Sequence, residues 1–293
     1  MATDWQEIAR QIGLAIGQPF VMRGQRAVGG GDINQAFVLD DGTQPYFIKL
    51  NSAARLGMFE AELAGLQEIG RAGVIRVPRP LCCGTAGGHS FLVLEYIAFG
   101  GPDHNSVIEL GRQLAALHRV TAPRFGWYRD NTIGATVQRN DYCTDWIVFW
   151  TEQRLRVQLD LLKRHGRSGR LMALGERLLE SLHALFAGYT PAPSLLHGDL
   201  WGGNYAFDER GQPVIFDPAV YYGDRETDLA MTELFGGFPA DFYAAYRDSF
   251  PLDEGYVRRR PLYNLYHILN HANLFGGGYA GQAERMMEVL LRG

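Results

Sequence analysis

One stretch of the sequence decides the fold: Leu196-His197-Gly198-Asp199-Leu200-Trp201-Gly202-Gly203-Asn204. It places Asp199 five residues before Asn204 in a glycine-containing loop, and thirteen residues after Asn204 the apolar run Val214-Ile215-Phe216 leads into Asp217. Phosphoryl transfer uses such a set, because one aspartate accepts the proton of the attacking hydroxyl while an asparagine oxygen and a second carboxylate hold magnesium. Each residue alone would suit a helix cap or a turn. Together they predict that Asp199 is a catalytic base and that Asn204 and Asp217 are metal ligands.

A lysine within an apolar strand points to the same chemistry. Residues 46–50 read as the strand Tyr46-Phe47-Ile48-Lys49-Leu50, and a charge there is costly to bury without a partner. Glu60 and Glu62 lie on the helix that the pattern predicts over residues 58–70. In kinases a lysine paired with a glutamate orients the nucleotide phosphates. Lys49 is therefore a candidate phosphate-binding residue, and a solvated lysine on the outer face of the strand is the alternative.

A glycine-rich segment precedes this strand. Gly29, Gly30 and Gly31 lie between two predicted strands, where backbone N–H groups could approach phosphates. The segment does not match G-x-G-x-x-G, so a glycine-rich hairpin loop without a ligand is the alternative. These three glycines are candidate nucleotide-binding residues.

The pattern of predicted elements changes near residue 100. Before it, short β-type runs at 34–39, 46–50, 79–84 and 90–96 accompany helices over 4–16 and 58–70. After Gly100-Gly101-Pro102 the patterns are helical, apart from two short β-type runs at 205–207 and 213–217. We therefore predict an α+β protein with a small β-rich lobe, residues 1–97, and a larger, mainly helical lobe, residues 98–293. The helices predicted in the second lobe are 104–120, 144–165, 170–187, 224–235, 239–249, 256–275 and 280–292.

Composition and charge limit the class of protein. The 293 residues are 46% hydrophobic and 20% charged, which excludes a disordered or fibrous chain, and a net charge of −4 gives no reason to expect a nucleic-acid partner. Cys82, Cys83 and Cys143 match no zinc or disulfide pattern. No secretory signal or membrane-spanning stretch is visible, so we expect a cytoplasmic protein without a membrane partner. Arg258-Arg259-Arg260 reads as a solvated charged turn.

Three strings of residues resemble the fructosamine/ketosamine kinase family, which belongs to the aminoglycoside phosphotransferase and choline kinase group. They are LHGDLWGGN at 196–204, FDPAVYYGDRE at 216–226 followed by DLAM at 228–231, and YNLYH at 263–267 with LNH at 269–271. The similarity covers essentially the whole chain, and the second string is quite specific to the family. The resemblance implies a two-lobed, protein-kinase-like fold and a kinase that uses ATP and Mg²⁺.

The resemblance also implies a substrate class. Enzymes of this family phosphorylate the sugar 3-hydroxyl of ketosamines, the Amadori-type adducts of fructose, ribulose or erythrulose on small amines or on glycated proteins. The phosphorylated product is unstable and releases the amine, so these enzymes are regarded as deglycating. A kinase of another hydroxylated amine, of the aminoglycoside, choline or homoserine type, is the nearest alternative. A nucleotide-binding protein without turnover is the alternative from a different class.

Within the first lobe, the resemblance assigns residues to the nucleotide. Glu62 is preferred to Glu60 as the partner of Lys49, because Leu66 completes the family's Glu-x-x-x-Leu pattern. The apolar strand at 91–97 runs to the position where kinases bind adenine through backbone groups. The resemblance therefore marks three consecutive adenine-site residues, Glu95, Tyr96 and Ile97.

Candidate substrate residues lie in the second lobe. Trp201 follows Asp199 by two residues, so its indole could stack on the substrate or could instead pack the loop. Polar residues at helical spacing within 263–275 suit a sugar-binding wall or, equally, a buried polar network; we take His267 and Asn270 as the candidates. By analogy with the family, His197 and Asp228 are expected to support the catalytic loop.

Overall fold

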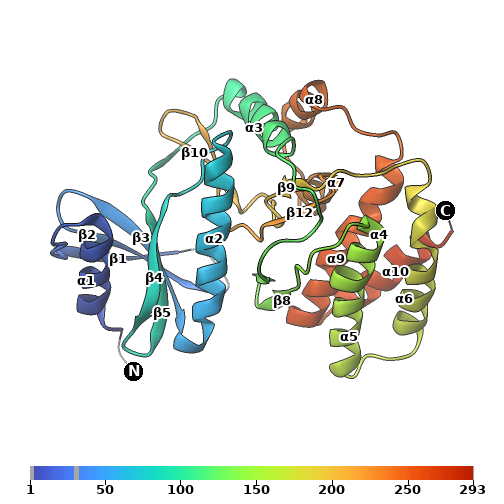
Figure 1. Cartoon of the computed structure of the whole chain (residues 1–293), viewed down its shortest axis with the longest axis horizontal. Helices are drawn as coiled ribbons and strands as arrows, with labels where there is room; N and C mark the ends of the chain where they lie inside the picture. The colour runs from blue at the N-terminus through green and yellow to red at the C-terminus, as the bar shows by residue number, and fades with distance from the viewer. Residues whose placement is uncertain (1–2, 30–32, 293) are drawn as a thin grey trace. The chain divides into compact units, whose positions relative to one another are not determined.

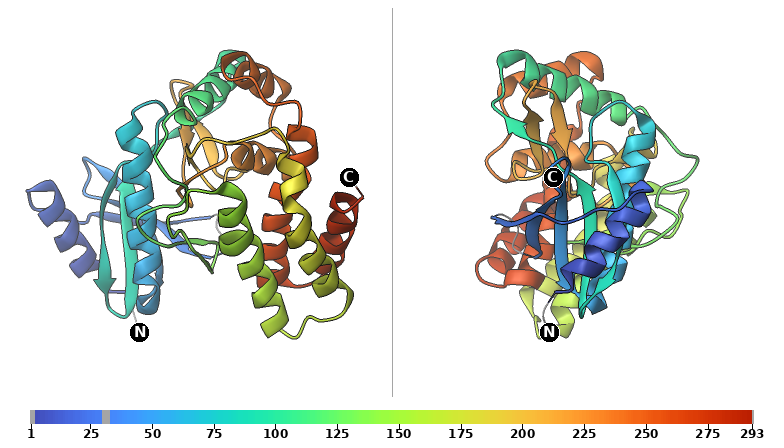
Figure 2. Two further views of the ribbon diagram at one scale, coloured as in Figure 1. Left: turned by 45° about the vertical axis from the view of Figure 1, so that its right-hand side comes forward. Right: turned by 90° about the vertical axis from the view of Figure 1, so that its left-hand side faces the viewer.

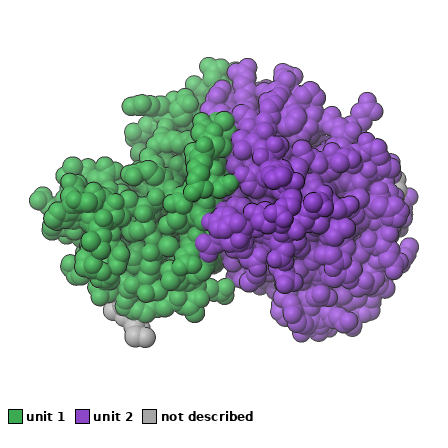
Figure 3. Space-filling view, viewed as in Figure 1, with its two compact units in different colours: residues 1–106, 206–218 green, residues 107–205, 219–293 purple. Residues whose placement is uncertain are grey.

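The computed structural model describes residues 3–29 and 33–292. The chain forms two compact units, Met1–Ser106 with Ala206–Pro218, and Val107–Tyr205 with Ala219–Gly293 (Figure 3). These units differ from the predicted lobes of residues 1–97 and 98–293, because the first unit ends later and also contains residues 206–218. The reason is strand pairing: β6 (Phe99–Gly100) is hydrogen-bonded to β10 (Tyr205–Asp208) about a hundred residues further along the chain.

A five-stranded antiparallel sheet with the order β1-β2-β3-β5-β4 forms the centre of the first unit (Figure 1). Its strands are β1 (Gly24–Val28), β2 (Gln35–Asp40), β3 (Pro45–Ser52), β4 (Pro80–Ala86) and β5 (His89–Glu95). The β-type runs predicted at 34–39, 46–50, 79–84 and 90–96 are thus confirmed, with ends that differ slightly.

Two helices cover the two faces of this sheet, α1 (Trp5–Ile16) and α2 (Leu56–Ala72), the latter following the 3-10 turn η1 (Ala53–Arg55) (Figures 1 and 2). Successive side chains of a strand point to opposite faces. Ile48 and Leu50 of β3 accordingly pack in the cluster that contains α1, while Phe47 packs in the cluster that contains α2. Lys49 lies between Ile48 and Leu50 in sequence, so the alternation turns its side chain toward α2.

A small three-stranded sheet, with the order β11-β10-β6, completes the first unit. Its third strand, β11 (Pro213–Ile215), ends two residues before Asp217. We predicted the runs at 205–207 and 213–217 as strands of the larger lobe. They form strands, and the structure groups residues 206–218 with the first unit, where β10 pairs with β6.

The second unit is mainly helical, and two two-stranded sheets accompany its helices: β7 (Asn131–Ile133) pairs with β8 (Thr136–Gln138), and β9 (Ser194–Leu196) pairs with β12 (Tyr221–Gly223). Helices α5, α6, α9 and α10 run alongside one another (Figure 2). No helix within residues 3–29 and 33–292 has both the length and the apolar character needed to cross a membrane. The helical segments are α3 (His104–Leu117), α4 (Trp146–Trp150), the π-helical turn η2 (Thr151–Leu155), α5 (Arg156–Arg164), α6 (Arg170–Ser181), the 3-10 turn η3 (Leu182–Phe186), α7 (Glu226–Leu234), α8 (Ala240–Ser249), α9 (Tyr256–Phe275) and α10 (Tyr279–Leu290).

The expected solvated turn at Arg258-Arg259-Arg260 is wrong for Arg259. This residue lies inside α9, its side chain is 2% exposed, and it donates to both carboxylate oxygens of Glu226 at 2.7 and 2.9 Å and to Asp253 at 2.6 Å. A buried charge is retained where it is paired and hydrogen-bonded, and here its partner Glu226 lies on α7. The arginine therefore joins two helices of the second unit.

Candidate active site

The side chain of Lys49 lies between two carboxylates within the first unit. Its Nζ is 2.6 Å from Oε1 of Glu62 on α2 and 2.6 Å from Oδ1 of Asp217 after β11. The predicted contact between Lys49 and Glu62 is therefore present, and its alternatives, Glu60 as the partner or a solvated lysine, do not describe the structure. The side chains of Lys49 and Glu62 are 7% and 11% exposed, whereas that of Asp217 is 44% exposed. The cluster is closed on the Glu62 side and open on the Asp217 side.

The electrostatics of this cluster keep the lysine charged. Burial alone would lower the pKa of Lys49, but the carboxylates of Asp217 and Glu62 outweigh that effect and raise the pKa above its ordinary value. Burial raises the pKa of Glu62, and Lys49 opposes that rise. The ammonium of Lys49 faces the carboxylates of Glu62 and Asp217. When both carboxylates are ionised, the cluster has a net charge of −1, and its exposed side is that of Asp217. That charge suits a cation at Asp217.

The backbone of Asp217 adopts an unusual conformation. Its φ is 59°, in the left-handed region, and among the described residues it is the non-glycine residue with a positive φ. Such a conformation is uncommon for residues with a Cβ, although Asp tolerates it better than most, and strained positions cluster at functional sites. The conformation of Asp217 is therefore set by the surrounding structure and not by the preference of its own backbone.

In the second unit, the start of the loop that contains Asp199 is anchored by Asp228 of α7. The carboxylate of Asp228 accepts the backbone N–H of His197 at 2.7 Å and that of Gly198 at 2.8 Å, and it is 1% exposed. Gly198 has φ 84°, and a Cβ there would lie 2.1 Å from the carbonyl oxygen of Ala219, so only glycine fits. The ring Nδ1 of His197, fully buried, accepts the N–H of Asp199 at 3.2 Å. His197 and Asp228 thus both make hydrogen bonds to the backbone of this loop.

Asn204 closes the same loop onto Asp199. Its amide nitrogen donates to the backbone carbonyl of Asp199 at 2.8 Å, and it lies 3.4 Å from Oδ2 of that residue. Its own N–H donates to the carbonyl of Trp201 at 2.9 Å. The amide of Asn204 therefore turns its nitrogen toward Asp199, and its oxygen is the atom through which it would hold a cation.

The three candidate substrate residues differ in exposure. Trp201 is 40% exposed, and its ring lies over Gly203, where a Cβ would be 2.4 Å from the indole. Asn270 is 3% exposed; its side-chain oxygen accepts from Gln158 and its side-chain nitrogen donates to the carbonyl of Ile133, as in the buried polar network that was the alternative to a sugar-binding wall. His267 is 5% exposed, and burial together with neighbouring His271 lowers its pKa to about 3. Trp201 is the member of this set that solvent reaches.

The predicted adenine residues are the last residue of β5, Glu95, and the two residues after it, Tyr96 and Ile97. The N–H of Glu95 donates to the carbonyl of Arg79 at 2.8 Å, and its carboxylate accepts Arg76 at 2.8 Å. The N–H of Glu95 is therefore already bonded within the first unit. Of the candidate glycines, Gly30 and Gly31 lie outside the described residues, and Gly29 is exposed next to β1, where a Cβ would meet nothing within 4 Å.

Comparison with known proteins decides the family. The model of the family described as fructosamine kinase matches residues 4–293. The chain belongs to the fructosamine kinase family. A probable ketoamine kinase from Synechocystis sp. is 50% identical over 289 residues, covering 98% of this chain and 97% of that protein. A chloroplastic protein-ribulosamine 3-kinase from Oryza sativa subsp. japonica is 40% identical over 295 residues, covering 100% of this chain and 86% of that protein.

A solved structure agrees with this membership in the fructosamine kinase family. The crystal structure of a fructosamine-3-kinase candidate from Haemophilus somnus superposes with a TM-score of 0.90 at 28% identity, and the match covers 99% of this chain and 98% of that chain. The predicted fold class, a two-lobed protein-kinase-like fold with a small β-rich part and a larger helical part, is confirmed.

The structure of this fructosamine kinase family member also places near the catalytic loop a residue that the sequence did not predict. His118, which follows the last residue of α3, is fully buried and lies 3.1 Å from Oδ2 of Asp228. It stands in no motif, and its partner lies 110 positions away. Only the tertiary contact of His118 with Asp228 on α7 could reveal it.

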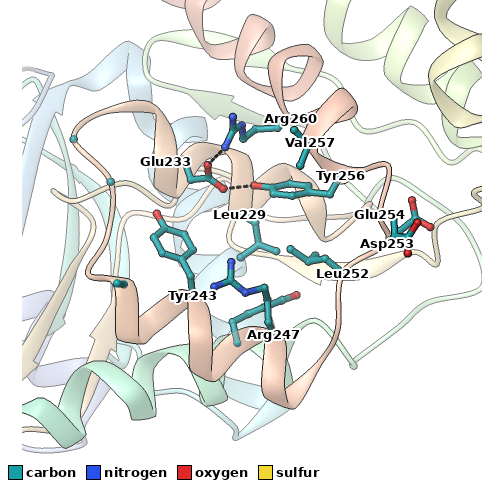
Figure 4. A pocket seen from close by; sticks show the side chains of 14 residues that line it. Leu229, Glu233, Tyr243, Arg247, Leu252, Asp253, Glu254, Tyr256, Val257 and Arg260 are labelled. Carbon is teal, nitrogen blue, oxygen red and sulfur yellow. Dashed lines mark hydrogen bonds and ion pairs between the residues drawn. The ribbon is translucent and has the colours of Figure 1, made fainter. Parts of the chain in front are cut away.

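A pocket of about 640 Å³ lies on the second unit (Figure 4). Glu233 lies at its edge, accepts the hydroxyl of Tyr256 at 2.6 Å and pairs with Arg260. None of the predicted site residues lines it. Its lining comes from α7, α8 and the beginning of α9, and from the segments that join them: Leu229, Glu233, Gly236, Gly237, Ala240, Tyr243, Tyr246, Arg247, Leu252, Asp253, Glu254, Tyr256, Val257 and Arg260.

Proposed function

We propose that this chain is an ATP- and Mg²⁺-dependent phosphotransferase that acts on the sugar 3-hydroxyl of ketosamines. The observation that carries the proposal is the intact cluster of Lys49, Glu62 and Asp217, since a phosphate-binding lysine and a strand-end carboxylate are what phosphoryl transfer requires. The choice of a ketosamine as the acceptor substrate is supported by membership in the fructosamine kinase family. It is also supported by the names of the relatives, ketoamine kinase and protein-ribulosamine 3-kinase.

In this proposal the first unit binds the nucleotide. Lys49 contacts the phosphates and Glu62 orients its ammonium. The carbonyl of Glu95 and the N–H of Ile97 bind the adenine edge, and the segment with Gly29, Gly30 and Gly31 offers backbone N–H groups to the phosphates.

The second unit carries the acceptor chemistry. The acceptor oxygen attacks the γ-phosphorus, the bond from that phosphorus to the bridging oxygen of ADP breaks, and the carboxylate of Asp199 takes the hydroxyl proton. Asn204 and Asp217 would hold Mg²⁺ through oxygen ligands, the type it prefers, and bound Mg²⁺ neutralises charge on the phosphates. Trp201 is proposed to stack on the sugar or on its amine.

A substrate panel tests the proposal. The protein is incubated with ATP and Mg²⁺ and, in separate reactions, with ribulosamines, fructosamines, erythrulosamines, a glycated protein, choline and an aminoglycoside, and ADP formation is measured. We expect turnover of ketosamines, with NMR placing the phosphate on the 3-oxygen and later release of the amine. Turnover of choline or an aminoglycoside without turnover of any ketosamine would contradict the substrate assignment, and nucleotide binding without any turnover would support the non-catalytic alternative.

The Lys49→Met variant tests the phosphate-binding role. Loss of the ammonium should raise the KM for ATP and lower kcat together, reducing kcat/KM by about 10–100-fold, because a hydrogen bond to a charged group contributes about 1.5–3 kcal/mol. Glu62→Ala should act in the same direction more mildly, and Glu60→Ala, on the exposed face of α2, is the matched control. Steady-state kinetics of both single variants and of the double variant measure the coupling; losses that simply add would show that Lys49 and Glu62 do not work as a pair.

A further inference from the structure

A buried row of polar side chains leads away from the catalytic loop, beyond Asp228. Oδ1 of Asp228 accepts the N–H of Gly198, and Oδ2 accepts both the N–H of His197 and, at 3.1 Å, the Nε2 group of His118. His118 is fully buried, and its other ring nitrogen, Nδ1, lies 2.8 Å from the hydroxyl of Tyr246 on α8, a residue that is also fully buried. The row therefore joins the residue after α3, together with α7 and α8, to the two residues that precede Asp199.

With an uncharged imidazole at His118, one set of hydrogen-bond directions satisfies every member of this row. A carboxylate oxygen can only accept, so Nε2 of His118 carries the hydrogen that Asp228 receives. Nδ1 of the uncharged imidazole then accepts from Tyr246. Arg225 can only donate, and its Nη1 lies 3.0 Å from the Tyr246 oxygen, so that oxygen accepts from Arg225 while its hydrogen points to His118. Removing one side chain of the row therefore leaves its neighbour without the donor or acceptor that it needs.

The outer end of the row is held in place. Arg225 also donates to the carbonyl of Phe250 at 3.0 Å and to that of Pro251, and its guanidinium lies 3.6 Å from the centre of the Phe250 ring. Burial would by itself raise the pKa of Asp228, but the hydrogen bond from His118 contributes most to holding that pKa below its ordinary value. Asp228 is thereby kept as an acceptor for the loop.

We propose that His118 and Tyr246 are positioning residues for phosphoryl transfer, which act through Asp228 and the backbone of His197 and Gly198 on the carboxylate of Asp199. This inference rests on the proposed function. The two N–H groups of the loop contact different oxygens of Asp228, so a rotation of that carboxylate moves both contacts. His118 is the side chain that opposes the rotation, and small displacements of a catalytic group reduce turnover strongly.

A set of substitutions at His118 tests the proposal by kinetics. His118→Leu keeps the bulk and removes both ring nitrogens, and it should lower kcat on a ketosamine about tenfold or more while the KM for ATP changes less than twofold. His118→Gln offers an N–H for Asp228 and an oxygen for Tyr246, and it should recover most of the loss. In an Asp199→Asn background, His118→Leu should cause no further loss, because the residue acts through Asp199.

A second variant keeps the test decisive if His118→Leu does not fold. Tyr246→Phe removes only the hydroxyl that orients His118, and it should lower kcat severalfold. The matched control is Tyr256→Phe, which removes the hydroxyl of another buried tyrosine that also donates to a carboxylate, that of Glu233, and should leave kcat unchanged. Equal effects of Tyr246→Phe and Tyr256→Phe, or an undiminished His118 effect in the Asp199→Asn background, would overturn the proposal.

Amide hydrogen exchange distinguishes failure of this inference from failure of the proposed function. The N–H groups of His197 and Gly198 should exchange faster in His118→Leu and Tyr246→Phe than in the wild type and in Tyr256→Phe. This measurement needs no substrate, so it remains informative if no ketosamine is turned over. Unchanged exchange at both positions would show that His118 and Tyr246 do not hold the loop.

Discussion

Replacing Asp199 by asparagine is expected to lower kcat by about 10²–10⁴-fold, which corresponds to about 3–5 kcal/mol of activation free energy. Asparagine keeps the size of the side chain but cannot take the proton of the attacking hydroxyl. The loop itself should keep its conformation, since Asp228 and His197 hold it through backbone N–H groups that the substitution does not change. The measurement is steady-state turnover of ATP with a ketosamine at saturating concentrations of both.

Stability and nucleotide affinity are the controls for this variant. Neither depends on proton transfer, so Tm and the Kd for ATP should stay near those of the wild type. Asp160→Asn, at an exposed position of α5, is the matched substitution and should have no effect on kcat. If Asp199 were only a turn or cap residue, asparagine would serve nearly as well, and kcat within about threefold of the wild type would contradict the catalytic assignment.

The Asp217→Ala variant should lose magnesium-dependent turnover by about 10³-fold or more, equivalent to about 4 kcal/mol or more of transition-state stabilisation. The carboxylate is half exposed beside Lys49, and its loss removes both a proposed metal ligand and the contact to the ammonium. A titration of kcat with Mg²⁺ separates these roles. Loss of a metal ligand raises the Mg²⁺ concentration needed for half-maximal rate, whereas loss of a partner of Lys49 alone does not.

Two other variants, Asn204→Ala and Glu62→Ala, distinguish a metal ligand from a partner of Lys49. Asn204→Ala should shift the Mg²⁺ dependence in the same direction but less, because a neutral amide oxygen is a weaker ligand than a carboxylate. Glu62→Ala, which disturbs Lys49 from the other side, should leave the Mg²⁺ dependence unchanged. Wild-type kinetics of Asp217→Ala at limiting Mg²⁺ would show that the metal assignment is wrong.

Several features of the candidate site could be predicted from the sequence because they depend on residues close together in the chain. The alternation along β3 places Lys49 on the face opposite to Ile48 and Leu50, and α2 follows directly, so Glu62 comes within reach of its ammonium. Asp199 and Asn204 belong to one loop, and the glycine at position 198 meets a local requirement for a positive φ. Short-range patterns of this kind are present in the sequence before any tertiary contact forms.

Other features were decided only by tertiary structure. The charge pattern at 258–260 looks like that of a solvated turn, yet Arg259 is buried, because Glu226 on another helix pairs with it. The two-residue strand β6 has no hydrophobic signature, and its pairing with β10 is what assigns residues 206–218 to the first unit.

The sequence by itself determined the family and the fold class and nominated the residues proposed for phosphoryl transfer, because motif spacing and strand alternation express local geometry. Tertiary structure alone decided how that chemistry is supported. His118 reaches Asp228 across 110 positions and Lys49 reaches Asp217 across 168. A buried charge or polar group is stable only beside its partner, and where that partner is distant in the chain, packing rather than local pattern determines which residues meet.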